Sequence, residues 1–138
     1  MSIENKAFVI IPVFNEEENI VEVILNTQKV FKNILCIDDG STDSTLSKIK
    51  QLKSVKFVSH SMNCGQGTSI LTGIKYFLNK TDLEYLITLD GDGQHSILDA
   101  KKMLNYIEKE NLDALFGSRF LSRESLKKIP LKRIILLK

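Results

Sequence analysis

Two aspartates separated by a single glycine have the spacing in this sequence that is best suited to chemistry. Asp90 and Asp92 lie in the segment LDGDGQ, residues 89–94, at the end of an apolar run. Two carboxylates this close at the end of a strand cannot both be buried without compensation. A hard divalent cation such as Mg²⁺ compensates them, because it takes one or two carboxylates together with phosphate oxygens. The pattern predicts a metal site of Asp90 and Asp92, with Gln94 as a further oxygen ligand, that neutralises a diphosphate leaving group.

Other kinds of site share parts of this pattern. An EF-hand loop that starts at Asp90 requires glycine at its sixth position and glutamate at its twelfth, where this sequence has His95 and Lys101, so it is excluded. A phosphatase of the aspartyl-phosphate kind carries its D-x-D after the first strand, whereas this one follows the fourth predicted strand. An ordinary turn remains the structural alternative, because Asp-Gly pairs are common turn formers.

A second pair of carboxylates, Asp38 and Asp39, follows another apolar run and precedes Gly40 and Ser41. One of them could accept hydrogen bonds from a nucleobase or a ribose while the other orients the helix that follows. The alternative is that Asp39, Ser41 or Thr42 caps this helix. Capping accounts for one of these residues but not for both carboxylates.

A third polar segment follows the first apolar run and contains Pro12, Phe14 and Glu16. Phe14 could lie against a nucleobase, and Glu16 could hydrogen-bond the edge of that base. The alternative is helix initiation by acidic residues in a first helical turn. This alternative suits Glu17 and Glu18 better than it suits Phe14.

A glycine-containing loop, CGQGT at residues 64–68, is similar to a phosphate-cradling turn at a helix N-terminus. The loop places Gly65 just before the predicted helix, but Ile70 stands where a full G-x-G-x-x-G motif has its last glycine. The sequence contains no G-x-x-x-x-G-K-[ST] motif, which excludes a P-loop NTPase.

Three further polar side chains lie near these segments. His95 could act on the phosphate groups of the ligand or help to place the metal, and it could equally begin the next helix. Arg119 could pair with a phosphate, with an ordinary surface arginine as the alternative. His60 is interpreted as a loop residue.

The polar segments recur because apolar runs alternate with helical patterns along the chain. Strands of this length with near-continuous apolar character are buried on both faces, which indicates a parallel sheet. The predicted fold is α/β, an open, mostly parallel Rossmann-like sheet with helices on both faces. Such sheets bind ligands at the carboxyl ends of their strands, where the polar segments lie. The strands are predicted at residues 8–12, 34–37, 55–58, 85–89 and 112–116.

Helix starts are predicted from the residues that can cap them. Asn15 is expected to be the N-cap of the first helix, with Glu18 completing a capping box. Ser41 or Thr42 is expected to cap the second helix. The third helix opens after the loop at 63–67, and the fourth begins at about Ser96.

Composition sets the class of protein. The 138 residues are 43% hydrophobic and 26% charged, the balance of one ordinary soluble domain. No apolar run approaches the roughly 20 residues that cross a bilayer, and the first residues lack the layout of a signal peptide. The two cysteines, Cys36 and Cys64, have no metal-ligand spacing and favour a reducing cytoplasm.

The range 123–138 differs in charge from the rest of the chain, because it holds six basic residues and Glu124 as its single acid. It indicates either contact with an anionic surface or a solvated helix end.

Taken together, these segments resemble the inverting family-two glycosyltransferases of the GT-A fold. The motifs that carry the resemblance are VIIPVFNEEENI at 9–20, IDDGSTD at 37–43, NCGQG at 63–67, LDGDGQH at 89–95 and GSRF at 117–120. The first three are similar to motifs of the whole family. The last two are similar to those of the subgroup that includes dolichyl-phosphate mannosyltransferases and polyprenyl-phosphate transferases.

The resemblance implies a role for each candidate residue. The donor would be a nucleoside-diphosphate sugar, with its nucleotide bound by residues at the first strand ends and in the glycine loop. Mg²⁺ or Mn²⁺ would hold the donor diphosphate, and three residues near the phosphates would serve catalysis. The nucleotide-binding residues would be Pro12, Phe14, Glu16, Asp39, Gly65 and Asp90, the metal ligands Asp90, Asp92 and Gln94, and the catalytic residues Asp92, His95 and Arg119.

The same resemblance implies the organisation and the partners of the chain. Residues 1–122 would form a sugar-nucleotide-binding domain, and 123–138 would begin a basic amphipathic helix that could contact the inner face of a membrane peripherally. The acceptor would be a polyprenyl phosphate or a glycan, and no nucleic-acid partner is expected. Two copies of the chain could form a homodimer. A module that only binds the sugar nucleotide is the alternative. A nucleotidyltransferase is disfavoured, because acidic residues after the first strand would repel a triphosphate.

Overall fold

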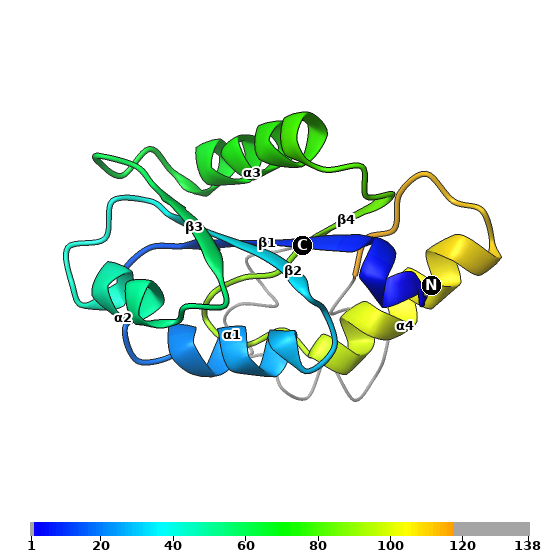
Figure 1. Cartoon of the computed structure of the whole chain (residues 1–138), viewed down its shortest axis with the longest axis horizontal. Helices are drawn as coiled ribbons and strands as arrows, with labels where there is room; N and C mark the ends of the chain where they lie inside the picture. The colour runs from blue at the N-terminus through cyan, green and yellow to red at the C-terminus, as the bar shows by residue number, and fades with distance from the viewer. Residues whose placement is uncertain (1, 118–138) are drawn as a thin grey trace, which may run out of the picture. The chain divides into compact units, whose positions relative to one another are not determined.

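A computed structural model describes residues 2–117 of the chain (Figure 1). The chain divides into two units after Tyr106. Residues 2–106 contain the sheet and the candidate site, and residues 107–117 contain the last turn of a helix and an irregular segment. In order, the elements are η1 (Ile3–Lys6), β1 (Ala7–Val13), α1 (Ile20–Gln28), β2 (Asn33–Asp38), α2 (Thr45–Gln51), β3 (Lys56–Ser59), α3 (Gln66–Lys80), β4 (Tyr85–Thr88) and α4 (Ile97–Lys109).

The sheet has four strands in the order β3-β2-β1-β4, and every neighbouring pair is parallel. Helix α3 covers one face of the sheet, and α1 and α2 cover the other (Figure 1). The predicted α/β class, the open parallel sheet and the helices on both faces are therefore confirmed. The crossover from β3 over to β4 reverses the direction in which strands are added, which creates a switch point between β1 and β4.

The core of the sheet lies on its two inner strands. All seven residues of β1 are buried, as are five of the six residues of β2. The outer strands differ, because three residues of β3 are exposed and β4 is half-buried to exposed. The expectation that all strands are buried on both faces is therefore wrong for the outer two, since each of these has only one neighbouring strand among the described residues.

Helix α3 lies unusually close to β1 because of a glycine. A side chain at Gly73 would place its Cβ 2.6 Å from two carbon atoms of Ile10, which is fully buried. The same face of β1 presents Phe8, whose ring lies 5.9 Å from that of Tyr76 and 5.8 Å from that of Phe77. The aromatic contacts and the missing side chain together fix α3, and with it the loop at its N-terminus, over the carboxyl end of the sheet.

Pro12 lies in a central strand, where a missing N–H normally removes a ladder hydrogen bond. Here the pairing of β1 with β4 ends at Ile10 and Thr88, and Leu89 donates its N–H to the Ile10 carbonyl beyond it. Alternate residues of a parallel strand direct their backbone groups to opposite neighbours, so Pro12 faces the β4 side past the end of this ladder. The proline therefore costs no sheet hydrogen bond and helps to open the strand end.

The predicted fifth strand at 112–116 is absent from the described residues. This segment has the apolar composition of a strand, but a strand also requires a neighbour with which its backbone pairs. Phe116 is 88% exposed. Composition alone was therefore misleading for this segment.

The predicted caps of the first two helices are also wrong. Helix α1 begins at Ile20 rather than directly after Asn15, whose φ of 53° lies in the left-handed region. Helix α2 begins at Thr45, whose N–H donates to Asp43 Oδ1 over 2.9 Å. The residues expected to cap helices instead connect two loops to each other.

This connection joins the loop after β1 to the loop after β2. The Asn15 side-chain oxygen accepts the Thr42 N–H over 2.9 Å, and the Asn15 N–H donates to Ser41 Oγ over 3.0 Å. The Ser44 N–H donates in the same way to the Glu17 carboxylate, 2.9 Å away. Reciprocal bonds of this kind hold the two loops as one unit at the carboxyl edge of the sheet.

Candidate functional site

A cavity of about 370 Å³ opens at the carboxyl ends of β1, β2 and β4, beside the N-terminus of α3. It lies where an open parallel sheet is expected to bind its ligand. Most of the predicted site residues from these three strand ends meet in it. The lining residues are Pro12, Val13, Phe14, Glu16, Asp39, Asn63, Gly65, Gln66, Ser69, Asp90, Gly91 and Asp92.

Asp39 is the most tightly held of these residues, with only 3% of its surface exposed. Its Oδ1 accepts the Cys64 N–H over 3.0 Å and lies 2.7 Å from His60 Nδ1. Its Oδ2 accepts the Gly65 N–H over 2.7 Å. Asp39 faces the cavity beside the side chain of Ser69, which also favours the ionised carboxylate.

The environment of Asp39 keeps this side chain charged. Burial alone would raise the pKa of the carboxyl, but hydrogen bonds from His60 and from the N–H groups of Cys64 and Gly65 favour the ionised form, and the net effect lowers the pKa. The result is a negative acceptor that is already oriented before any ligand binds. The alternative role of Asp39 as a helix cap is excluded, because α2 begins six residues later.

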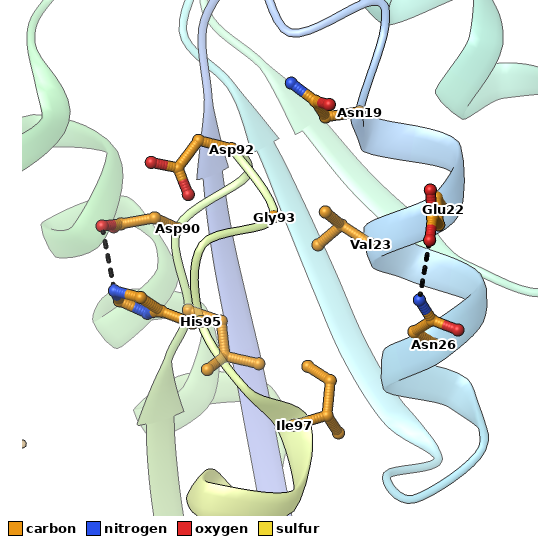
Figure 2. A pocket seen from close by; sticks show the side chains of 10 residues that line it. Asn19, Glu22, Val23, Asn26, Asp90, Asp92, Gly93, His95 and Ile97 are labelled. Carbon is orange, nitrogen blue, oxygen red and sulfur yellow. Dashed lines mark hydrogen bonds and ion pairs between the residues drawn. The ribbon is translucent and has the colours of Figure 1, made fainter. Parts of the chain in front are cut away.

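Asp90 and Asp92 are held more loosely at the other side of the cavity. Asp90 Oδ1 accepts a hydrogen bond from Gln66 Nε2 over 2.8 Å, and Asp90 Oδ2 lies 3.4 Å from His95 Nε2. The Asp90 side chain is 39% exposed. Figure 2 shows the carboxylates of Asp90 and Asp92 pointing to the same side of the loop that carries them. This arrangement suits a shared cation.

Gln94 contributes differently from the prediction. Its backbone N–H donates to Asp92 Oδ1 over 2.9 Å, which helps to orient that carboxylate. Its exposed side chain lines neither of the two cavities described here. The role of Gln94 as a metal ligand stays a prediction.

A second, smaller cavity of about 180 Å³ lies between α1 and the loop after β4 (Figure 2). Asp90 and Asp92 line both cavities, whereas His95 lines only this one. Helix α1 contributes Glu22 and Asn26, which are hydrogen-bonded to each other. His95 is therefore brought beside Asp90 but does not line the larger cavity.

The remaining predicted residues are placed as follows. Pro12 forms part of the wall at the end of β1, and Phe14 is 40% exposed beside it. The Glu16 carboxylate accepts a hydrogen bond from Asn19 Nδ2 over 2.9 Å. Arg119 lies outside the described residues, as does the whole range 123–138.

Two residues that were not predicted as site residues contact the carboxylates of the cavity. His60 contacts Asp39 from the end of β3, and Gln66 contacts Asp90 from the first turn of α3. The position of His60 directly after a strand was the available signal, because chemistry gathers at these strand ends. The contact of Gln66 with Asp90 depends on how α3 lies over the sheet, which local sequence does not specify.

Among the described residues, one group of three has potential metal ligands within 4.8 Å of one another, namely Asp39, His60 and Cys64. The proximity already has a structural explanation, since Asp39 accepts from the Cys64 backbone N–H and faces the His60 ring. Asp90 and Asp92 have fewer protein partners, so they remain the better candidates for a divalent ion.

Residues 8–136 match the model of the glycosyl transferase family 2. The chain belongs to this family. Among curated proteins, it is 40% identical over 133 residues to an uncharacterized protein of Methanocaldococcus jannaschii, covering 95% of this chain and 54% of that protein. It is 30% identical over 143 residues to a UDP-N-acetylglucosamine–dolichyl-phosphate N-acetylglucosaminyltransferase of Methanococcus voltae, covering 91% of this chain and 57% of that protein. The chain thus spans about half the length of the curated relatives it matches.

Solved structures support the fold of this family 2 member. The chain matches glucosyl-3-phosphoglycerate synthase from Mycobacterium tuberculosis, solved with uridine diphosphate, with a TM-score of 0.59 and 20% identity over 72% of this chain and 38% of the other. It also matches S. aureus TarS residues 1–349 with a TM-score of 0.59 and 21% identity, over 84% of this chain and 40% of the other. Within residues 2–117, no helix is long and apolar enough to cross a membrane.

Proposed function

We propose that this chain holds the donor side of a metal-dependent, inverting glycosyltransferase that moves a sugar from a nucleoside-diphosphate sugar to a polyprenyl phosphate or a glycan. One observation carries the proposal. A single cavity combines a buried, ionised carboxylate, Asp39, with two partly exposed carboxylates, Asp90 and Asp92. The first suits the hydrogen-bond donors of a nucleoside, and the other two suit a cation that binds a diphosphate.

The nucleoside would lie at the ends of β1 and β2. Phe14 offers a half-exposed aromatic ring on which a base can lie. Asp39 would accept a hydrogen bond from an N–H of the base or a hydroxyl of the ribose. Because its carboxylate is fixed by three protein donors, little ordering remains to be done when the ligand binds.

The diphosphate would lie between the loop after β4 and the start of α3. Asp90 and Asp92 would hold Mg²⁺ or Mn²⁺, which supplies positive charge to the leaving diphosphate. Helix α3 has 15 residues and presents its positive end at Gly65 and Gln66, beside the same cavity. The Gln66 amide orients Asp90 from this helix end.

The names of relatives support a lipid-phosphate acceptor. One relative is named for transfer to dolichyl phosphate, and a polyprenol monophosphomannose synthase of Mycolicibacterium smegmatis is 26% identical over 140 residues, covering 96% of this chain and 52% of that protein. A phosphate acceptor is already ionised at neutral pH, so it requires no general base from the protein. Attack opposite the leaving diphosphate would invert the configuration at the sugar carbon.

Calorimetric titration with UDP, GDP, ADP and CDP, each with and without Mn²⁺, tests the donor side. We expect one nucleotide to bind best, with an affinity that falls when Mn²⁺ is removed. Absence of binding for all four would overturn the proposal. Transfer of a radiolabelled sugar to polyprenyl phosphate then separates an enzyme from the alternative, a module that binds the donor without transferring its sugar.

A further inference from the structure

His60 lies behind the candidate nucleoside site, and both of its ring nitrogens meet oxygen atoms. Nδ1 is 2.7 Å from Asp39 Oδ1, and Nε2 is 3.0 Å from Thr72 Oγ1. The side chain is 14% exposed. His60 therefore connects the end of β3 both to the carboxylate after β2 and to helix α3.

The hydrogen-bond directions around the ring follow from the partners. Asp39 is ionised and only accepts, so His60 Nδ1 donates its hydrogen to this carboxylate. Thr72 Oγ1 lies 3.0 Å from the Thr68 carbonyl as well as 3.0 Å from His60 Nε2. A hydroxyl can both donate and accept, so it can satisfy Nε2 in either direction.

The contact also restrains how the Asp39 carboxylate can turn. The Cys64 and Gly65 N–H groups, which belong to the loop before α3, also donate to this carboxylate. They hold the carboxylate from the loop, whereas His60 holds it from the end of β3. With donors from both elements, rotation of the carboxylate breaks at least one charge-assisted hydrogen bond.

We propose that His60 is a positioning residue for donor recognition, which orients the Asp39 carboxylate toward the nucleoside and couples it to helix α3 through Thr72. This inference rests on the proposed function, because it assigns Asp39 to the nucleoside. It makes His60 a determinant of nucleoside affinity and leaves binding of the diphosphate to other residues.

Two substitutions separate the two contacts of the ring. The amide nitrogen of asparagine can take the place of Nδ1, so His60→Asn keeps a donor for Asp39. The amide group of glutamine reaches the place of Nε2, so His60→Gln keeps a hydrogen-bonding group for Thr72 and removes the donor for Asp39. The ligands are Mn²⁺ with the tightest-binding of UDP, GDP, ADP and CDP, and Mn²⁺ with inorganic pyrophosphate, which lacks the nucleoside.

We expect His60→Gln to weaken nucleotide binding by about tenfold, the lower end of the effect of residues that orient a binding group. Pyrophosphate binding should remain that of the wild type, and His60→Asn should bind the nucleotide within about threefold of wild type. Equal nucleotide affinity in His60→Gln and wild type would overturn the inference. So would a parallel loss of pyrophosphate binding, because that is the signature of a general structural role.

Threonine variants give a second comparison, with one threonine inside α3 and one at its C-terminal end. Thr72 and Thr81 each donate a hydroxyl to the carbonyl four residues earlier, over 3.0 and 2.9 Å, but only Thr72 also faces His60. Thr72→Val should weaken nucleotide binding by about threefold, whereas Thr81→Val should not. Equal affinities of these two variants would argue against the coupling to α3.

The hydrogen on Nδ1 is measured without a ligand. Nitrogen chemical shifts of His60 in the wild-type protein should show a protonated Nδ1, and an unprotonated Nδ1 would overturn the direction of its hydrogen bond to Asp39. If the wild type binds none of the four nucleotides, the proposed function fails together with this inference. If it binds and the glutamine variant binds equally well, only the inference fails.

Discussion

The two aspartates at the end of β2 differ from the two aspartates after β4 in burial and in hydrogen bonding. Asp38 and Asp39 are both buried, and protein donors bind their oxygens. Asp90 and Asp92 are partly exposed, and their side chains contact one glutamine amide, one histidine ring and one backbone N–H. The first pair belongs to the folded framework, whereas the second still has room for ligands.

The difference shows what each pair contributes. A buried carboxylate must have its hydrogen bonds before the ligand arrives, because an unpaired buried charge is destabilising. A partly exposed pair of carboxylates needs no such protein partners before a cation binds, because water solvates it. Asp39 should therefore matter for both folding and binding, while Asp92 should matter for binding alone.

The largest effect is expected from removing Asp39. Asp39→Ala leaves the N–H groups of Cys64 and Gly65 and the His60 ring without their acceptor. Breaking a buried charged contact on one side costs about 3 kcal/mol or more of unfolding free energy. Urea denaturation followed by circular dichroism measures this loss, and a change below about 0.5 kcal/mol, typical of a surface site, would remove the contrast between the two pairs.

The next effect is expected at Asp92. Asp92→Asn should weaken Mn²⁺-dependent nucleotide binding by roughly 100-fold, since it removes the charge of a candidate ligand, and leave the unfolding free energy within about 0.5 kcal/mol. Calorimetry and urea denaturation supply the two measurements. Asp82→Asn is a matched control, because Asp82 is an exposed aspartate in the turn before β4. Wild-type affinity in Asp92→Asn would place the cation elsewhere.

The pH dependence of stability sharpens the same contrast. The pKa of Asp39 is lowered from its ordinary value of 3.8, so its contribution to stability is complete above about pH 4 and is lost as the pH falls through the lower, folded-state pKa. Asp43 behaves in the same direction. Unfolding free energies measured from pH 5 to pH 2 should fall more steeply for the wild type than for Asp39→Ala. Identical slopes would show that Asp39 is not ionised preferentially in the folded protein.

The smallest effect is expected at Gln66, an exposed residue whose amide donates to the partly exposed Asp90. Gln66→Ala should weaken Mn²⁺-dependent nucleotide binding by about threefold, because one hydrogen bond at an exposed site contributes about 0.5–1 kcal/mol. Titration calorimetry of this variant beside wild type checks the value. A loss as large as that of Asp92→Asn would mean that Gln66 itself contacts the ligand.

The sequence predicted a site residue correctly where its position follows from its own strand. It failed where the position depends on a contact with a distant segment. Asp39, Asp90, Asp92 and Phe14 follow strands, so the rule for parallel sheets brought them to one cavity correctly. Asn15, which was expected to cap a helix, was misjudged because its partners are about 26 residues away in the neighbouring loop. The segment 112–116 was misjudged because apolar composition does not supply a pairing partner.

The sequence by itself determined the class of fold, since near-continuous apolar strands between amphipathic helices favour a parallel sheet, and it determined which strand ends carry polar groups. Only the tertiary structure decided which carboxylate is held and which is left open. That distinction depends on where α3 lies, because the loop before α3 brings two N–H groups to Asp39 while its first turn brings Gln66 to Asp90. Helix α3 reaches this position through close contact with β1 at Gly73, a contact between segments more than 60 residues apart that no local pattern encodes.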